Sequence, residues 1–281
     1  MTSLSSAFAV NTYAYMQSRD AGDCIAHLAA RGYRAVELML FPGHLWPAEL
    51  SPGARRDLRR AAEALGVAIT TLNMPNIDIN VAAAAEEMRR YSLDQLAASV
   101  ELAGELGVPA LLIGPGKPNP LFPLPTERMM GHFFAALDRL VPLAARHGTS
   151  IAIENLPIAF LPGADDLMDA LERYGAPGID IVYDLANAVF HREDPAWGLG
   201  RVRDRLRLIH LSDTGHEVYR HDPVGRGVVP FARIPSVLDA IGYRGPSVLE
   251  IISPTPDADI EASAAALVSL GWAPRPHGAT A

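Results

Sequence analysis

The chain has 281 residues, a formal net charge of −8 at pH 7 and a single cysteine, Cys24. This charge disfavours a nucleic-acid partner, which would require a basic surface against the phosphates. No apolar run approaches the length of a membrane span, and no signal segment is recognisable at the N-terminus. We therefore expect a cytoplasmic protein that has neither nucleic acid nor a membrane as a partner.

Predicted strands alternate with predicted helices along the chain, and most of the helical stretches end at a glycine. The expected strands are Phe8–Tyr13, Ala35–Met39, Ala68–Leu72, Ala110–Ile113, Ser150–Glu154, Ile179–Asp184, Leu206–His210 and Ser247–Ile251. The expected helices are Asp20–Arg31, Pro52–Leu65, Glu86–Leu106, Thr126–His147, Ala164–Tyr174, Pro195–Arg203, Phe231–Ile241 and Asp257–Leu270.

This alternation predicts parallel βαβ units, and eight of them at this length favour a closed (β/α)8 TIM barrel of the α/β class. No Gly-x-Gly-x-x-Gly follows the first strand, which disfavours a dinucleotide-binding fold. No linker interrupts the pattern, so we expect a single barrel domain over residues 1–272. Residues 273–281 are rich in Pro, Gly and small residues, and we expect a flexible C-terminal tail there.

Four predicted strands in the second half of the chain each end on a side chain that can bind a metal: Glu154, Asp184, His210 and Glu250. A charge directly after a buried strand is costly unless a cation or strong donors receive it. The carboxyl ends of barrel strands also carry the active sites of TIM-barrel enzymes. Three carboxylates and one imidazole suit one divalent cation such as Mn, Mg, Co or Zn, which we predict at this position.

The sequence around these residues resembles the xylose isomerase-like barrels, a family of sugar isomerases, epimerases and related dehydratases. The matching segments are Ile-Glu-Asn at Ile153–Asn155, Tyr-Asp-Leu-Ala-Asn at Tyr183–Asn187, Ile-His-Leu-Ser-Asp at Ile209–Asp213, Pro-Val-Gly-Arg-Gly at Pro223–Gly227 and Leu-Glu-Ile at Leu249–Ile251. The resemblance covers nearly the whole chain in strand order. It implies that the four strand-end residues bind one divalent metal and that Glu154 and Glu250 also form the acid–base pair.

Two departures from relatives in the family affect the function that the resemblance implies. Many of its sugar epimerases carry a histidine three residues after the aspartate ligand, where this chain has Asn187. An amide can orient a ligand or a substrate hydroxyl but cannot take a proton at neutral pH, and the nearby His191 is another candidate for that role. The multi-metal DNA-repair endonucleases of the family need further His and Glu ligands from the earlier strands. This chain offers Glu37, Asn73 and Gly114 there, which are too few for a three-metal cluster.

Other polar and aromatic residues near the strand ends are candidates for contacts with a small polar substrate. They are Glu37, Asn73, Asn187, Arg220, Arg226 and Trp46. Glu37 could instead orient His210 from behind or pair with a cation at the barrel mouth. Either arginine could hold a carboxylate, phosphate or hydroxyl group of the substrate, and the aromatic loop residues would supply apolar walls.

We therefore predict a metal-dependent sugar isomerase or epimerase that acts on a small hydroxy-carbonyl compound through an enediolate. A ketose, a sugar acid or a cyclitol would fit this description. The alternative is a dehydratase of the inosose or dehydroshikimate type, in which the same enediolate expels a β-hydroxyl. A non-catalytic sugar-binding barrel is disfavoured, because a binder has no need of two opposed carboxylates. A homo-oligomer is compatible with the sequence, which leaves the oligomeric state open.

Overall fold

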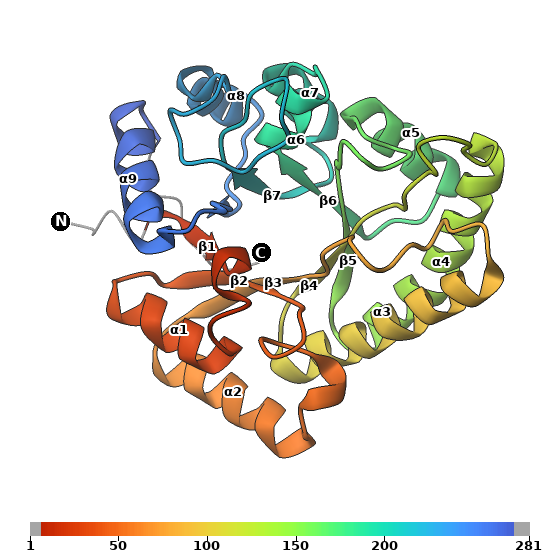
Figure 1. Cartoon of the computed structure of the whole chain (residues 1–281), viewed down its shortest axis with the longest axis horizontal. Coiled ribbons are helices and arrows are strands. Elements are labelled where there is room, and N and C mark those ends of the chain that lie inside the picture. The colour runs from red at the N-terminus through yellow and green to blue at the C-terminus, as the bar shows by residue number, and fades with distance from the viewer. Residues whose placement is uncertain (1–6, 273–281) are drawn as a thin grey trace.

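In the computed structural model, which describes residues 7–272, the strands close into one parallel barrel (Figure 1). The strands follow one another around the ring in chain order, and β8 pairs with β1. They are β1 Ala9–Asn11, β2 Ala35–Met39, β3 Ala68–Asn73, β4 Ala110–Ile113, β5 Ser150–Glu154, β6 Ile179–Asp184, β7 Leu206–Leu211 and β8 Ser247–Leu249. The predicted TIM barrel is confirmed, and the expected tail at residues 273–281 lies outside the described residues.

The helices surround the strands in an outer ring (Figure 1). They are α1 Ala21–Ala30, α2 Pro52–Ala64, α3 Glu86–Leu106, α4 Thr126–Arg146, α5 Ala164–Tyr174, α6 Leu185–Phe190, α7 Pro195–Val202, α8 Ile234–Ala240 and α9 Pro256–Ser269. Short 3-10 turns lie at Tyr13–Tyr15, Pro47–Glu49 and Phe231–Arg233. Within residues 7–272, no helix combines the length and the apolar character that crossing a bilayer requires.

The first and last strands are shorter than the sequence suggests, yet their backbone pairing continues past the assigned ends. Thr12 N donates to Glu37 O at 3.0 Å, and Glu250 N donates to Leu211 O at 3.1 Å. Glu250 is therefore held by the sheet although it follows β8. This backbone restraint fixes the direction from which its side chain enters the barrel mouth.

Helix α6 has no counterpart among the predicted helices. It begins directly after β6, and five of its six residues are buried, so it lacks the polar face that reveals a helix in a sequence. Asp184 caps it, with its Oδ1 accepting a hydrogen bond from Asn187 N at 2.7 Å. The same aspartate thus ends a strand and starts a helix, which brings Asn187 to the carboxyl end of the barrel.

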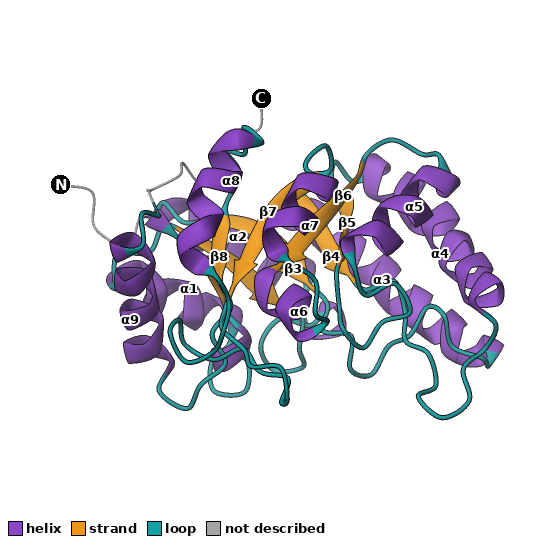
Figure 2. Cartoon of the chain, turned by 90° about the horizontal axis from the view of Figure 1, so that it is seen from above, coloured by secondary structure: helices purple, strands orange, loops and turns teal. Residues whose placement is uncertain are grey.

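Long loops gather at one end of the barrel (Figure 2). The longest, residues 212–230, follows β7 and is organised by the buried carboxylate of Asp213. Its oxygens accept hydrogen bonds from the backbone N–H groups of Thr214 at 3.0 Å, Gly225 at 2.8 Å and Val229 at 3.1 Å. A Cβ at Gly227 would overlap the Thr214 carbonyl and the Asp213 carboxylate. The loop therefore has one well-defined path over the barrel mouth.

Candidate metal centre

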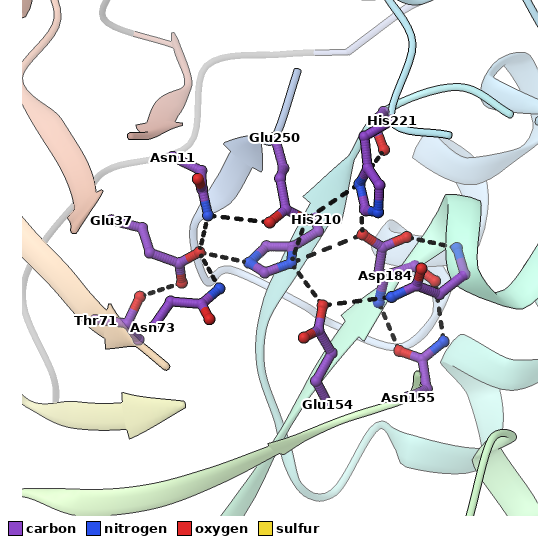
Figure 3. A network of polar contacts seen from close by, with 12 residues as sticks. Asn11, Glu37, Thr71, Asn73, Glu154, Asn155, Asp184, His210, His221 and Glu250 are labelled. Carbon is purple, nitrogen blue, oxygen red and sulfur yellow. Dashed lines mark hydrogen bonds and ion pairs between the residues drawn. The ribbon is translucent and has the colours of Figure 1, made fainter. Parts of the chain in front are cut away.

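Three carboxylates and one imidazole converge at the carboxyl ends of four neighbouring strands (Figure 3). Glu154 ends β5, Asp184 ends β6, His210 lies in β7 and Glu250 follows β8. Each offers one ligand atom, and these atoms all lie within 4.8 Å of one another. Asp184 and His210 are fully buried, whereas the two glutamates keep 5% of their surface exposed. The structure thus brings together the four residues that the sequence predicted as metal ligands.

One nitrogen of the His210 ring, Nδ1, faces three carboxylates. This atom lies 3.0 Å from Glu154 Oε1, 3.2 Å from Glu250 Oε2 and 3.7 Å from Asp184 Oδ2. One N–H can donate along only one of these directions, and Asp184 Oδ2 and Glu250 Oε2 have no hydrogen-bond partner although both atoms are buried. A divalent cation would coordinate the carboxylate oxygens and the imidazole nitrogen at once, so the residues fit a metal ion.

Burial and charge crowding change the proton affinity of these groups in the metal-free protein. Burial raises the pKa of Glu154 to about 7 and the pKa of Asp184 to about 6. Burial alone would lower the pKa of His210, but the surrounding carboxylates, with Glu37 the strongest, raise it well above its ordinary value. Near neutral pH, the metal-free centre therefore holds protons that a cation must displace.

The affinity for Mn2+ is accordingly expected to rise as the pH increases through about 6 and about 7, the pKa values of Asp184 and Glu154. The sign follows because only the deprotonated donors bind metal, so protons compete with the cation at lower pH. Titration calorimetry at several pH values, in buffers that differ in ionisation enthalpy, measures both the affinity and the protons released. An affinity that stays constant from pH 5.5 to pH 8 would contradict this competition.

A second set of polar residues lies on the side of the His210 ring that faces away from Glu154 and Asp184 (Figure 3). Its Nε2 is 2.9 Å from Glu37 Oε1, a close contact that lacks the geometry of a hydrogen bond. Glu37 is fully buried and accepts from Asn11 Nδ2 at 2.6 Å, from Asn73 Nδ2 at 3.1 Å and from the Thr71 hydroxyl. These contacts favour an orienting role for Glu37, which would leave Nδ1 of the histidine for the metal.

Two asparagines that the sequence did not indicate as site residues contact the candidate ligands from neighbouring strands. Asn155 accepts from Asp184 N at 2.7 Å and donates to Asp184 O at 3.0 Å, so it pins the backbone of that ligand. Asn11 Nδ2 lies 3.2 Å from Glu250 Oε1. Asn155 could have been identified, because it stands directly beside Glu154 in the Ile-Glu-Asn segment. Asn11 carries no comparable signal.

His221, in the loop 212–230, is a buried residue of the site that the sequence did not single out. Its Nδ1 lies 3.0 Å from Ser212 Oγ, 3.3 Å from Glu250 Oε2 and 3.7 Å from Asp184 Oδ2. Burial would lower the pKa of His221, but the carboxylates of Glu250, Asp184 and Glu154 together outweigh burial and raise the pKa to about 9. Burial likewise would raise the pKa of Glu250, and His210 and His221 together hold it below its usual range. Asp184 and Glu250 thus share a cationic neighbour.

Three of the predicted substrate contacts lie outside this network. The Arg226 side chain is 64% exposed and lies 3.6 Å from Asp259 Oδ1, whereas Arg220 is exposed at the loop surface. Trp46 is half-buried and packs against the hydrophobic core. Contacts of these three residues with a substrate stay predictions.

Comparison with known proteins agrees with this architecture. The fructoselysine 3-epimerase of Shigella flexneri is 22% identical over 227 residues, which are 79% of this chain and 82% of that protein. The inosose dehydratase of Geobacillus thermodenitrificans is 25% identical over 251 residues, which are 81% of this chain and 80% of that protein. The crystal structure of a D-tagatose 3-epimerase-like protein superposes with a TM-score of 0.81 at 20% identity, covering 94% of this chain and 96% of that one.

A family model covers most of the barrel and the four strand-end residues. The family model described as xylose isomerase-like TIM barrel matches residues 25–270, which is most of the chain. The resemblance seen in the sequence motifs is confirmed by this match. The protein belongs to the xylose isomerase-like TIM barrel family.

Proposed function

We propose that the protein is a divalent-metal-dependent isomerase or epimerase of a small hydroxy-carbonyl compound, such as a ketose, a sugar acid or a cyclitol. The convergence of Glu154, Asp184, His210 and Glu250 on one buried point is the observation that carries the proposal. The fructoselysine 3-epimerase relative, which is similar to 79% of this chain, supports the same reaction class.

The four converging residues would hold one cation, of the Mn, Mg, Co or Zn kind. When bound, such an ion supplies Lewis-acid polarisation of a substrate carbonyl, which acidifies the neighbouring C–H group. Glu37 contributes by holding the imidazole of His210 in place from the opposite side. Asn155 contributes by fixing the backbone of Asp184.

In this proposal the two glutamates would move protons on different sides of a substrate. Glu154 enters from β5 and Glu250 from beyond β8, with β6 and β7 between them in the ring. They are also the two ligands that keep some exposed surface. In the proposed reaction, one carboxylate removes the proton next to the carbonyl, and the other returns a proton to the opposite face or to a neighbouring atom.

A dehydratase is the second candidate function, because the inosose dehydratase relative matches 81% of the chain. Its reaction would begin with the same proton removal and then expel a hydroxyl group from the adjacent carbon. The two candidates therefore use the same residues and differ only in how the intermediate breaks down.

Incubating the purified protein and Mn2+ with D-fructose, D-tagatose, fructoselysine, an inosose and dehydroshikimate separates the two reactions. An epimerase converts a ketose into its epimer, which NMR detects, whereas a dehydratase produces an unsaturated carbonyl with its own ultraviolet absorbance. We expect an epimeric product that disappears when a chelator removes the metal. Absence of conversion for the whole panel, from protein shown to contain metal, would contradict the proposal.

A further inference from the structure

Asn187 occupies a buried position between the metal centre and the loop 212–230. It lies in the first turn of α6, and its backbone N is held by Asp184 Oδ1 at 2.7 Å. Its side chain has two neighbours on opposite sides. Nδ2 lies 3.5 Å from Glu154 Oε1, and Oδ1 accepts a hydrogen bond from the Tyr219 hydroxyl at 2.6 Å. The residue is fully buried, so both contacts are sheltered from solvent.

The chemistry of these neighbours supports one orientation of the amide. As an ionised ligand Glu154 can only accept hydrogen bonds, so the group that faces it must be the NH2 of Asn187. The amide oxygen then faces Tyr219, whose hydroxyl can donate to it. The reverse orientation would set the amide oxygen against the carboxylate. Tyr219 therefore donates the hydrogen bond that the amide oxygen of Asn187 needs and that the ionised Glu154 cannot supply.

Tyr219 is itself held in place on two sides. His221 Nε2 lies 2.9 Å from its hydroxyl oxygen. Its ring packs against the ring of Phe190, with centroids 5.2 Å apart, and against the ring of His221, also at 5.2 Å and inclined by 75°. Because the Tyr219 hydroxyl donates its hydrogen bond to Asn187 Oδ1, its oxygen can accept a hydrogen bond from His221 Nε2–H. The hydroxyl thus has a fixed direction of donation.

These contacts join the two glutamates along one side of the site. His221 Nδ1 lies 3.3 Å from Glu250 Oε2, and the chain continues through Tyr219 and Asn187 to Glu154. We propose that Tyr219 is a positioning residue, which holds the amide of Asn187 with its N–H groups toward Glu154 and the metal centre. This inference rests on the proposed function, because it treats Glu154 as a metal ligand.

An amide held in this way has a defined preference for its remaining contact. One hydrogen of the NH2 group faces Glu154, and the other can be donated to an oxygen of the substrate, whereas the amide oxygen is occupied by Tyr219. Position 187 would then recognise an acceptor, such as a carbonyl oxygen or a hydroxyl oxygen, and would disfavour a group that only donates.

Tyr219→Phe tests the role, because it removes the hydroxyl and keeps the ring that packs on Phe190. We expect its dissociation constant for Mn2+, measured by calorimetry on the full chain, to rise about tenfold, as for other residues that orient a metal ligand. Tyr174→Phe is the matched control, since it removes a hydroxyl that donates to Asp138 at 2.9 Å on the surface. The control should bind Mn2+ as the unmodified protein does.

A double-mutant cycle distinguishes positioning through Asn187 from a general loss of stability. If Tyr219 acts through the amide, Tyr219→Phe causes little further loss of Mn2+ affinity in an Asn187→Ala background. Unchanged affinity in the single variant, or losses that simply add in the double variant, would overturn the positioning role alone. An unmodified protein that binds no Mn2+ would instead overturn the proposed function and this inference with it.

Discussion

Replacing Glu154 or Glu250 by glutamine is expected to lower turnover by about two orders of magnitude or more, the usual range for general acid–base catalysis. Glutamine keeps an oxygen for the metal and nearly the same shape, but it cannot take a proton. The loss should therefore appear in turnover, measured at saturating Mn2+. One of the two variants should still exchange the carbon-bound hydrogen of the substrate with deuterium from solvent, because its surviving glutamate can complete the first proton transfer.

Glu217→Gln provides the control for this pair. Glu217 lies in the loop 212–230 and its side chain is 91% exposed, so the same chemical change there should leave turnover intact. Near-normal turnover in Glu154→Gln, in Glu250→Gln and in the control would contradict this prediction. The two glutamates would then have no role in proton transfer.

Asp184→Asn is expected to abolish the response of the protein to Mn2+ without weakening the metal-free fold. Burial raises the pKa of Asp184 to about 6, so its ionised form is less stable in the folded protein than in the unfolded chain at neutral pH. A neutral amide avoids this cost, and its oxygen can still cap α6 by accepting from Asn187 N. Without the carboxylate, however, a bound metal would lose one of three proposed anionic ligands.

Thermal melting with and without Mn2+ measures both effects. The metal-free variant should melt no lower than the metal-free unmodified protein, and added Mn2+ should raise the melting temperature of the unmodified protein alone. Asp180→Asn is a control in the same strand, where Asp180 pairs with Arg207 at 2.6 Å instead of with the metal centre. A variant at position 184 that retained the full Mn2+ shift would show that this carboxylate is not a ligand.

The barrel and the cluster of potential metal ligands could be predicted because both depend on strand ends. Strands that are buried on both faces give short apolar runs between helices, and in a parallel barrel their carboxyl ends meet at one mouth. Glu154, Asp184, His210 and Glu250 stand at those ends, so their proximity follows from the topology. No knowledge of the loops is needed for this part of the site.

The contacts around the cluster could not be predicted, because they depend on how the loops fold. His221 and Tyr219 reach the centre only because Asp213 ties the loop 212–230 together through three backbone N–H groups. Asn11 meets Glu250 across 239 positions of sequence, through the closure of β1 on β8. Helix α6 was missed because an almost fully buried helix has no amphipathic pattern.

Deuterium exchange tests the central claim, metal-dependent proton removal by the strand-end glutamates, most directly. The Mn2+-loaded protein is incubated in D2O with the same panel of ketoses, fructoselysine, inosose and dehydroshikimate, and NMR follows the hydrogens next to each carbonyl. We expect deuterium at one such carbon, and we expect this exchange to be lost on chelation and in the Glu154→Gln, Glu250→Gln double variant. Exchange that persists in the double variant, or no exchange in any compound by protein that binds Mn2+, would contradict the claim.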